Sequence, residues 1–201
     1  MKKFLSVILL SVMLFAFAAI GSHAATNYTV EKGDSLWKIA NKYQVGLSEI
    51  KAANPSIKNY DLIYPGQIIN IPTVSSSVTA FESEVVRLVN EIRVSRGLKP
   101  LTEDWQLSRV ARYKSQDMKD RGYFSHTSPT YGSPFDMMKS FGISYRTAGE
   151  NIAKGYSTPK AVVDAWMNSP GHRANILNSS YTHIGVGYVA SGNYWTQMFK
   201  G

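Results

Sequence analysis

The hydrophobic positions at the start of the chain form one continuous run instead of a periodic pattern. Lys2 and Lys3 precede an apolar or small-residue stretch from Phe4 to Ile20, and Ser22-His23-Ala24 then supplies a small-x-small sequence. This order is typical of a secretory signal peptide, so we predict a signal peptide over residues 1–24, cleaved between Ala24 and Ala25. A retained N-terminal anchor is the alternative, because the run approaches the length of a spanning helix. No second run of that length follows, so we expect no membrane span after signal removal.

Periodicity in the next block, residues 25–72, predicts a small domain with the order strand, helix, helix, strand. Residues 28–31 alternate and are β-prone, and residues 68–71 form the closing strand. Between them, Leu36, Ile39 and Ala40 fall on one face of a helix over residues 36–43. A second short helix over residues 48–54 ends at Pro55.

The longer second block, residues 81–201, carries helical periodicity first and strand patterns last. Apolar residues recur at helical spacing over residues 84–93 and 104–121, and a Ser133-Pro134-x-Asp136 capping box opens another helix. Thr158-Pro159 and Ser169-Pro170 open two more helices, and residues 184–189 and 194–199 form a strand hairpin. We therefore predict an α+β sandwich. We place Trp105, Trp166 and Trp195 in its core and a solvated helix face over residues 114–121.

A Ser-rich stretch, residues 73–80, separates the two blocks. As a flexible coil this stretch would span about 16 Å. The two domains would then be closely tethered without needing a fixed interface.

Composition changes this picture in two respects. Cysteine is absent, so an exported chain must be held together by core packing or by a metal. The formal charge is +8, or +6 once Lys2 and Lys3 are removed, which favours a place beside an anionic polymer such as the wall. The basic residues form no arginine-rich or aromatic-interleaved stripe, so we expect no nucleic-acid partner.

Three motifs in the first block are specific. They are Tyr28-Thr29-Val30-x-x-Gly33-Asp34-Ser35-Leu36-Trp37, Asn54-Pro55 and Tyr64-Pro65-Gly66-Gln67-x-Ile69-x-Ile71-Pro72. Over roughly residues 27–72 the block resembles the LysM family, whose members bind peptidoglycan, chitin and other glycans that contain N-acetylglucosamine. The family's groove lies between the loop after the first strand and the loop after the second helix. The resemblance implies a small βααβ domain whose glycan site comprises Gly33, Asp34, Ser35, Leu36, Asn54, Pro55 and Ile57.

Five motifs in the second block follow one another in a characteristic order. They are Val89-Asn90-x-x-Arg93-x-x-x-Gly97, Phe124-Ser125-His126, Gly149-Glu150-Asn151-Ile152, Trp166-x-x-Ser169-Pro170-Gly171-His172-Arg173 and Gly185-Val186-Gly187. Together they resemble the bacterial CAP (SCP/PR-1-like) domain, which implies an α-β-α sandwich over residues 81–201. In its cleft, His126, Glu150 and His172 match the family's two histidines and glutamate. Asn168 and Ser169 stand where animal and plant members usually have a further glutamate, so the family's set is incomplete here.

The three cleft residues allow two interpretations. Two imidazoles and one carboxylate can serve as zinc ligands with an open position, so a divalent metal such as zinc is the one cofactor that His126, Glu150 and His172 could hold. Alternatively, these side chains hydrogen-bond one another and tie the cleft together. A nucleophilic role for Ser125 is disfavoured, because the side chains of sequence neighbours usually point apart, and His183 is predicted to be a surface residue.

We accordingly expect a secreted protein of the cell wall or the spore envelope. Its LysM-like domain would bind peptidoglycan, and its CAP-like domain would present a cleft of undetermined ligand, with no catalytic residue assigned. The competing hypothesis is a metal-dependent hydrolase that acts on wall or lipid substrates in that cleft.

Overall fold

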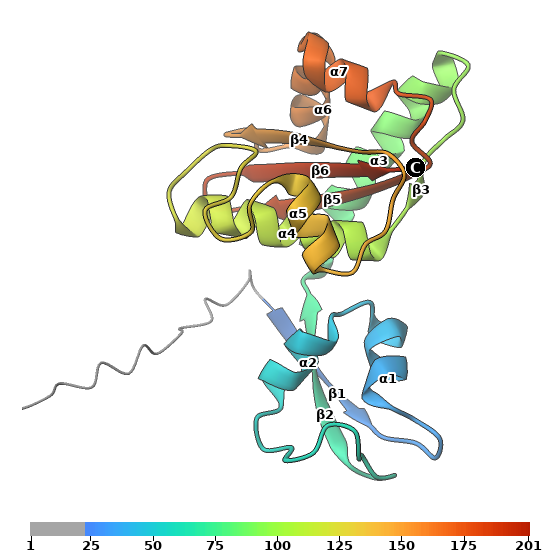
Figure 1. Cartoon of the computed structure of the whole chain (residues 1–201), viewed down its shortest axis with the longest axis vertical. Helices are drawn as coiled ribbons and strands as arrows, with labels where there is room; N and C mark the ends of the chain where they lie inside the picture. The colour runs from blue at the N-terminus through green and yellow to red at the C-terminus, as the bar shows by residue number, and fades with distance from the viewer. Residues whose placement is uncertain (1–22) are drawn as a thin grey trace, which may run out of the picture.

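The computed structural model describes residues 23–201, which fold into two domains (Figure 1). Residues 1–22 lie outside the described part, so the predicted signal peptide is not tested by it. Within the described part, no helix combines the length and the apolar character needed to cross a membrane.

The N-terminal domain is a two-stranded sheet covered by two short helices. Strand β1 (His23–Thr29) pairs antiparallel with β2 (Ile68–Val74), and helices α1 (Leu36–Tyr43) and α2 (Leu47–Ala53) lie between them in sequence. The hydroxyl of Ser35 caps α1 by accepting a hydrogen bond from the Lys38 amide. The domain has a core of its own, which contains Tyr28, Val30, Leu36, Ile39, Ala40, Val45, Ile50, Ile69 and Ile71. The predicted strand, helix, helix, strand order is confirmed.

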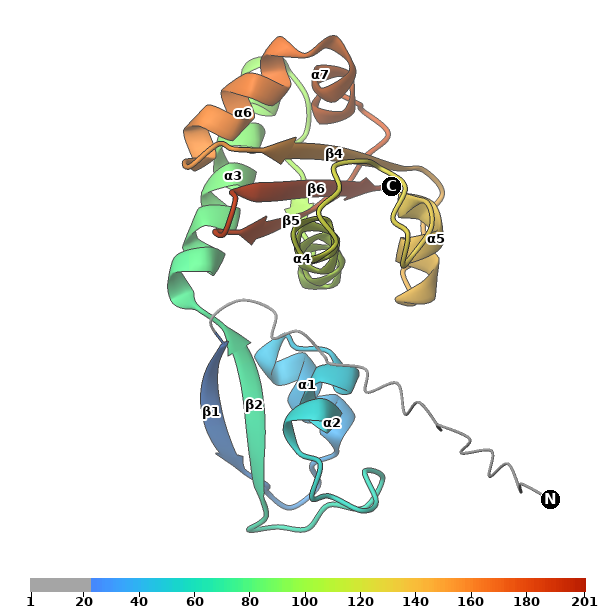
Figure 2. The ribbon, with the colours of Figure 1, turned by 90° about the vertical axis from the view of Figure 1, so that its left-hand side faces the viewer.

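The C-terminal domain is a four-stranded sheet with helices on both faces. The strand order is β3 (Thr102–Glu103), β5 (His183–Val189), β6 (Tyr194–Lys200) and β4 (Ala148–Lys154). Helices α3 (Ser76–Ser95), α6 (Pro159–Asn168) and α7 (Pro170–Ile176) contribute to the core on one face of the sheet. Helices α4 (Trp105–Asp120) and α5 (Pro134–Ser140) cover the other face (Figure 2). The predicted α-β-α sandwich is confirmed.

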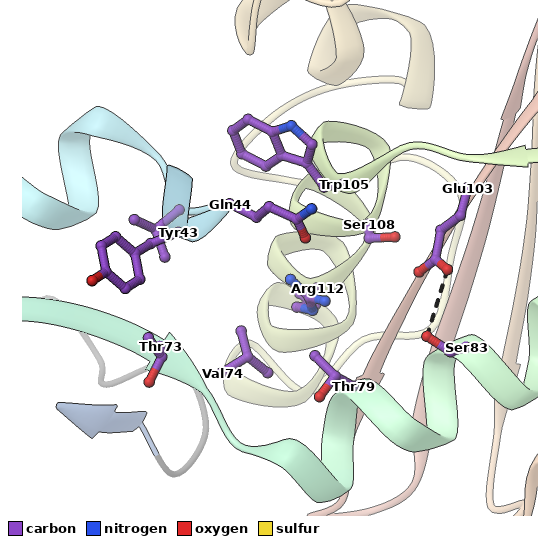
Figure 3. A pocket seen from close by; sticks show the side chains of 11 residues that line it. Tyr43, Gln44, Thr73, Val74, Thr79, Ser83, Glu103, Trp105, Ser108 and Arg112 are labelled. Atoms are coloured by element: carbon purple, nitrogen blue, oxygen red, sulfur yellow. Dashed lines mark hydrogen bonds between the residues drawn. The ribbon is translucent and has the colours of Figure 1, made fainter. Parts of the chain in front are cut away.

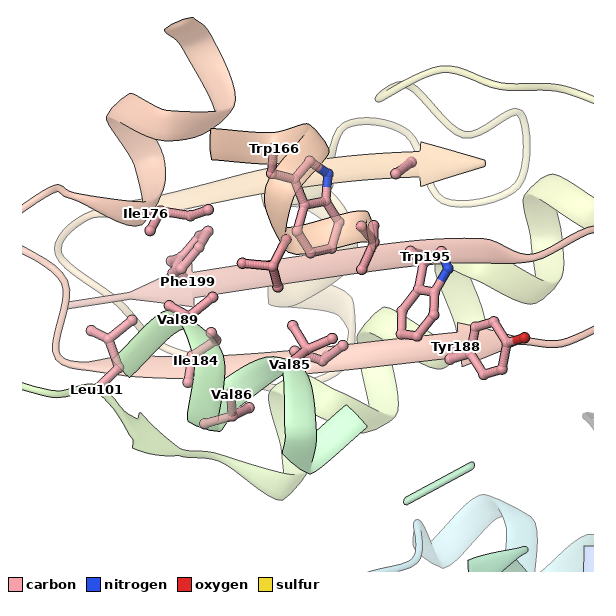
Figure 4. Packing of buried hydrophobic residues seen from close by; sticks show 14 of the residues in the cluster. Val85, Val86, Val89, Leu101, Trp166, Ile176, Ile184, Tyr188, Trp195 and Phe199 are labelled. Carbon is pink, nitrogen blue, oxygen red and sulfur yellow. The ribbon is translucent and has the colours of Figure 1, made fainter. Parts of the chain in front are cut away.

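The larger core is built around aromatic side chains of the sheet. Trp195 and Phe199 on β6 and Tyr188 on β5 face α3 and α6 (Figure 4). Trp166 is buried among them, and its indole N–H donates to the Ile152 carbonyl at 3.3 Å. Burial of apolar area on this scale is the main favourable contribution to folding.

Helix α4 packs so closely on β5 that two glycines are required. A Cβ atom at Gly185 would overlap the backbone of Leu107 and Ser108, and one at Gly187 would overlap the backbone of Ala111 and Arg112. The Gly185-Val186-Gly187 motif therefore serves the packing of a helix on a strand.

A buried arginine explains a second motif. Arg93 on α3 is 1% exposed and donates from its guanidinium to the carbonyls of Lys99, Ile176 and Asn178. Asn90, one turn earlier, pairs its side-chain amide with the backbone of Leu101. The Asn90-x-x-Arg93 motif thus ties the segment between α3 and β3, and the end of α7, to helix α3.

The structure corrects the expectation of a flexible coil over residues 73–80. Strand β2 continues to Val74, Ser75 caps α3, and α3 begins at Ser76, eight residues before the expected start. The Ser75 hydroxyl accepts from the Val78 amide at 3.4 Å, and Val78 packs against the larger core. Serine is a preferred N-cap residue, so a Ser-rich stretch is compatible with the start of a helix.

Two other expectations are wrong. Trp105 is half-exposed on α4 instead of buried in the core, whereas Trp166 and Trp195 are buried as expected. The expected solvated face over residues 114–121 contains Lys114, Ser115, Gln116 and Met118, all of which are buried. Strands β3 and β4 were not among the predicted elements.

Candidate functional site

The N-terminal domain contains a cavity of about 200 Å³ at the start of α1. Its walls come from the β1–α1 loop, from α1 and α2, and from the segment that follows α2. The lining residues are Asp34, Ser35, Leu36, Trp37, Leu47, Lys51, Tyr60, Asp61 and Ile63. We call this cavity the LysM groove.

The loop that forms one wall of the LysM groove is held rigidly. Gly33 adopts a positive φ of 92°, a conformation that favours glycine. The Asp34 carboxylate accepts from the Tyr28 hydroxyl at 2.7 Å and from the Glu31 amide at 2.8 Å. These hydrogen bonds lower the pKa of Asp34 below its ordinary value, and the bond from Tyr28 has the largest effect. The groove therefore presents a fixed, charged acceptor at neutral pH.

An exposed indole lies beside this acceptor. Trp37 is 66% exposed although it follows the buried Leu36 directly on α1. An exposed large aromatic ring next to fixed polar groups is typical of a site for an amphipathic ligand. The sequence pattern marks Trp37 only as part of a motif, and the structure adds that its exposed ring lines the LysM groove.

The structure brings together only part of the predicted glycan site. Asp34, Ser35 and Leu36 line the groove, and Gly33 shapes their loop. The other predicted residues do not line it.

Asn54 lies in the domain interior, where its side chain has a structural task. It is 4% exposed, donates to the carbonyls of Ile50 and Asn70, and accepts from the Asn70 amide. Ile57 packs against the core, and Pro55 is exposed outside the groove. Tyr60, Asp61 and Ile63, which follow in sequence, take the expected place opposite Asp34.

The C-terminal domain brings His126 and Glu150 into direct contact. Nδ1 of His126 lies 2.8 Å from Oε1 of Glu150. Glu150 comes from β4 with its side chain only 2% exposed, whereas the His126 side chain is 52% exposed in the loop after α4. The pair therefore joins a buried carboxylate to a solvent-facing imidazole.

A buried lysine lies beneath this pair. Lys114 is 1% exposed, and its Nζ donates to the carbonyls of Ser125 and His126 at 2.7 and 2.8 Å. It thereby fixes the backbone that carries His126. Burial raises the pKa of Glu150, while the hydrogen bond from His126 and the charges of Lys114 and His126 oppose that rise. Oε2 of Glu150 has no hydrogen-bond partner among the described residues.

His172 is linked to the pair through backbone and amide contacts. Asn151 donates to the His172 carbonyl at 3.1 Å, and Asn175 donates to the Glu150 carbonyl at 3.2 Å. Burial, followed by the charge of His126, lowers the pKa of His172. The imidazole of His172 therefore favours its neutral form.

A zinc site at His126, Glu150 and His172 stays a prediction. Within residues 23–201, no group of three or more His, Cys, Asp or Glu side chains is arranged to hold a metal ion. Glu150 is directed toward His126, and His172 makes no side-chain hydrogen bond to either of them. The three residues thus fit the alternative interpretation better, with His126 and Glu150 joined by a hydrogen bond. The Ser125 hydroxyl accepts a hydrogen bond from the Thr127 amide at 3.2 Å.

Two family models match the chain. The model described as the cysteine-rich secretory protein family, CAP, matches residues 86–199, and the LysM domain model matches residues 28–72. Both ranges lie within the predicted domains.

Individual relatives cover one or both domains. The uncharacterized protein YkwD of Bacillus subtilis is 70% identical over 126 residues, which are 63% of this chain and 49% of that protein. The N-acetylmuramoyl-L-alanine amidase sle1 of Staphylococcus aureus is 35% identical over 99% of this chain and 67% of its own. The chain spans about half the length of YkwD, and likewise 48% of the uncharacterized membrane protein YlbC of Bacillus subtilis.

A solved structure shares the fold of the C-terminal domain. The crystal structure of an extracellular protein containing an SCP domain from Bacillus anthracis superposes with a TM-score of 0.59 at 35% identity. The match covers 68% of this chain and 47% of that one.

Proposed function

This chain belongs to the CAP family and carries a LysM domain, and from that premise we propose that it is a secreted protein that binds wall peptidoglycan. The LysM groove holds the glycan, and the CAP domain is presented at the wall as a binding module. The CAP cleft binds a second ligand, and through it the protein takes part in the assembly of the cell surface or the spore envelope.

The observation that carries the proposal is the combination of Trp37 and Asp34 in the groove. Trp37 offers an exposed apolar ring, and Asp34 and Ser35 offer polar groups fixed by the loop. A sugar with an N-acetyl group has an apolar ring face and polar hydroxyl and amide groups, so it can use both at once. Little ordering of the protein is needed on binding, because the loop is already held by Tyr28 and Gly33.

Two further observations support a place at the wall. The relative sle1 is named for action at the bond between N-acetylmuramic acid and L-alanine, which lies in peptidoglycan. The formal charge of +6 that remains once Lys2 and Lys3 are removed also favours residence beside anionic wall polymers.

We propose a binding role for the cleft because its acidic member is used internally. The predicted carboxylate of the cleft, Glu150, is buried and holds His126 by a hydrogen bond. The position of the family's further glutamate carries Asn168 and Ser169, which cannot exchange a proton as a carboxylate does.

Co-sedimentation with purified peptidoglycan tests the groove. We expect the exported chain, residues 25–201, to sediment with peptidoglycan at about 0.5 M salt, where attraction between exposed charges is screened. Trp37→Ala should reduce sedimentation. Tyr64→Ala is the matched control, because Tyr64 is 59% exposed in the same domain but does not line the groove. Equal loss in the two variants would contradict the proposal.

A release assay tests the binding role of the cleft. We expect no free amines or reducing ends to accumulate when the exported chain is incubated with peptidoglycan, with or without added zinc. Product that grows with protein and time, and that disappears in Glu150→Gln, would contradict the proposal in favour of hydrolysis.

A further inference from the structure

The two domains enclose a second cavity, of about 380 Å³, that is separate from the LysM groove and from the cleft at Glu150 (Figure 3). The end of α1 and the end of β2 form one wall, and α3 and α4 form the other. Its volume falls within the range of about 300–1,000 Å³ that is typical of small-molecule sites. We call it the interdomain cavity.

A set of contacts beside this cavity holds its two walls together. Glu49 on α2 accepts from Arg109 on α4, from Nε at 2.5 Å and from Nη2 at 2.8 Å. The Tyr113 hydroxyl donates to the same carboxylate at 2.9 Å, and Arg109 also donates to the Ser48 hydroxyl at 3.0 Å. We call these four residues the interdomain clamp. Together with the direct passage from β2 into α3, the clamp gives the cavity a defined shape.

The cavity wall carries hydrogen-bond donors that the fold does not use. The indole N–H of Trp105, Nη1 of Arg112 and the side-chain amide of Gln44 have no hydrogen-bond partner among the described residues. Acceptors are supplied by the Glu103 carboxylate, which has a long contact of 3.5 Å from the Ser83 hydroxyl. Figure 3 shows these groups around one space, with the Trp105 ring at its edge.

The charges in the cavity are nearly balanced. The guanidinium of Arg112 makes three hydrogen bonds to the buried carboxylate of Glu82, so its charge is matched within the fold. Glu103 adds one exposed negative charge. An anionic polymer would find no unmatched positive group there, whereas a neutral ligand rich in hydroxyl groups would meet donors, acceptors and one aromatic face.

From these observations we propose that the interdomain cavity is a second saccharide site, which binds a sugar unit of the wall glycan between the two domains. The proposal rests on the proposed wall-glycan function and assigns a further part of the chain to it. Trp105 stacks on the sugar ring, and Gln44, Glu103 and Nη1 of Arg112 bind its hydroxyl and amide groups. Because the residues come from both domains, neither domain alone contains the site.

The four tryptophans allow both sites to be observed in one titration. We would record ¹H–¹⁵N spectra of the exported chain while adding the tetramer of N-acetylglucosamine, with indole signals assigned from Trp→Phe variants. Trp37 reports on the LysM groove and Trp105 on the interdomain cavity. Trp166 and Trp195 are internal controls, because their indole groups donate to the carbonyls of Ile152 and Tyr156. We expect the Trp37 and Trp105 signals to shift and the other two to remain in place.

A double variant separates direct binding from an indirect shift. Gln44→Ala combined with Glu103→Gln should raise the dissociation constant read from the Trp105 signal by about fivefold or more. The Trp37 binding curve should stay unchanged. Glu91→Gln, an exposed change on α3, should alter neither curve.

Each outcome has a distinct meaning. If Trp37 shifts to saturation while Trp105 does not, or if the double variant leaves the Trp105 curve unchanged, the second site is refuted and the groove stands. A Trp105 shift that requires a fragment bearing the stem peptide would refute the saccharide assignment in favour of a peptide site. If neither signal shifts with any wall fragment, the proposed function itself fails.

Discussion

Glu49 in the LysM domain and Arg109 in the CAP domain form a bidentate salt bridge. Nε and Nη2 of Arg109 donate to Oε1 and Oε2 of Glu49. Their side chains are only 16% and 18% exposed. The guanidinium also lies over the rings of Tyr113 and Phe141, with its central carbon 5.7 and 5.0 Å from their centroids. This geometry joins the domains more firmly than an exposed ion pair would.

Removing this arginine should loosen the LysM domain from the CAP domain. Arg109→Ala leaves the half-buried Glu49 carboxylate without its cation, and we expect a loss of about 1–3 kcal/mol in the stability of the two-domain arrangement. Calorimetry should show the LysM domain melting earlier while the CAP domain changes little. Arg146→Ala, an exposed arginine of the CAP domain, is the control. Identical melting of the Arg109 variant and wild type would show that the contact contributes nothing.

The same contact should weaken in acid. Burial raises the pKa of Glu49, but the hydrogen bond and charge of Arg109, with the hydrogen bonds of Ser48 and Tyr113, outweigh it and lower the pKa. A carboxyl group whose pKa falls on folding stabilises the fold above its unfolded value of 4.5, and this stability is lost as pH falls through the lower folded value. The melting temperature should fall between neutral pH and about pH 3. Glu49→Gln should show a smaller fall than wild type, because the contribution of the Glu49 carboxylate is absent in that variant. An unchanged pH profile in that variant would contradict the assignment.

A glycine makes the contact possible. Gly46 is buried with an ordinary φ of −72°, so its backbone needs no glycine. A Cβ atom there would overlap the Glu49 carboxylate and the Arg109 guanidinium. Gly46→Ala should therefore widen the distance distribution between spin labels on the two domains. Gly171→Ala is the control, because a Cβ atom at Gly171 meets nothing within 4 Å, and it should leave the distance distribution unchanged. An equally narrow distribution in the Gly46→Ala and Gly171→Ala variants would refute the steric argument.

The sequence predicted most elements whose signals are local. The helix over residues 36–43 and the Ser133–Asp136 capping box are found as expected, because spacing and caps determine both. The strand at residues 148–154 was missed because its residues, including Gly149, Glu150 and Asn151, lack the alternation of a half-buried strand. They are buried by neighbours on both sides of the sheet.

The site was predicted less completely, because its residues depend on contacts between distant segments. Asn54 carries the polar side chain expected of a ligand contact, but tertiary packing turns it toward Asn70. Trp105 and Arg109 have the pattern of an ordinary helix, and only the position of the LysM domain makes them interfacial. Lys114 occupies a helical position where an apolar residue would be expected. The sequence pattern does not show that its ammonium group binds the carbonyls of Ser125 and His126.

Lys114 should be required for the cleft. Lys114→Met leaves the carbonyls of Ser125 and His126 without their donor and removes a positive charge near Glu150, so we expect a loss of about 2–4 kcal/mol in unfolding free energy. Lys119→Met on the exposed side of α4 should change stability by about 0.5 kcal/mol or less. Denaturant titration measures both, and equal stabilities would show that Lys114 does not hold the loop.

We propose that the LysM groove binds wall glycan through Trp37. Calorimetric titration with the N-acetylglucosamine tetramer at about 0.5 M salt measures this binding. We expect the exported chain to bind the tetramer, Trp37→Ala to bind it about tenfold more weakly, as loss of one stacked aromatic ring implies, and Tyr64→Ala to match wild type. Unchanged affinity in Trp37→Ala, or no binding of the tetramer by wild type, would contradict the account.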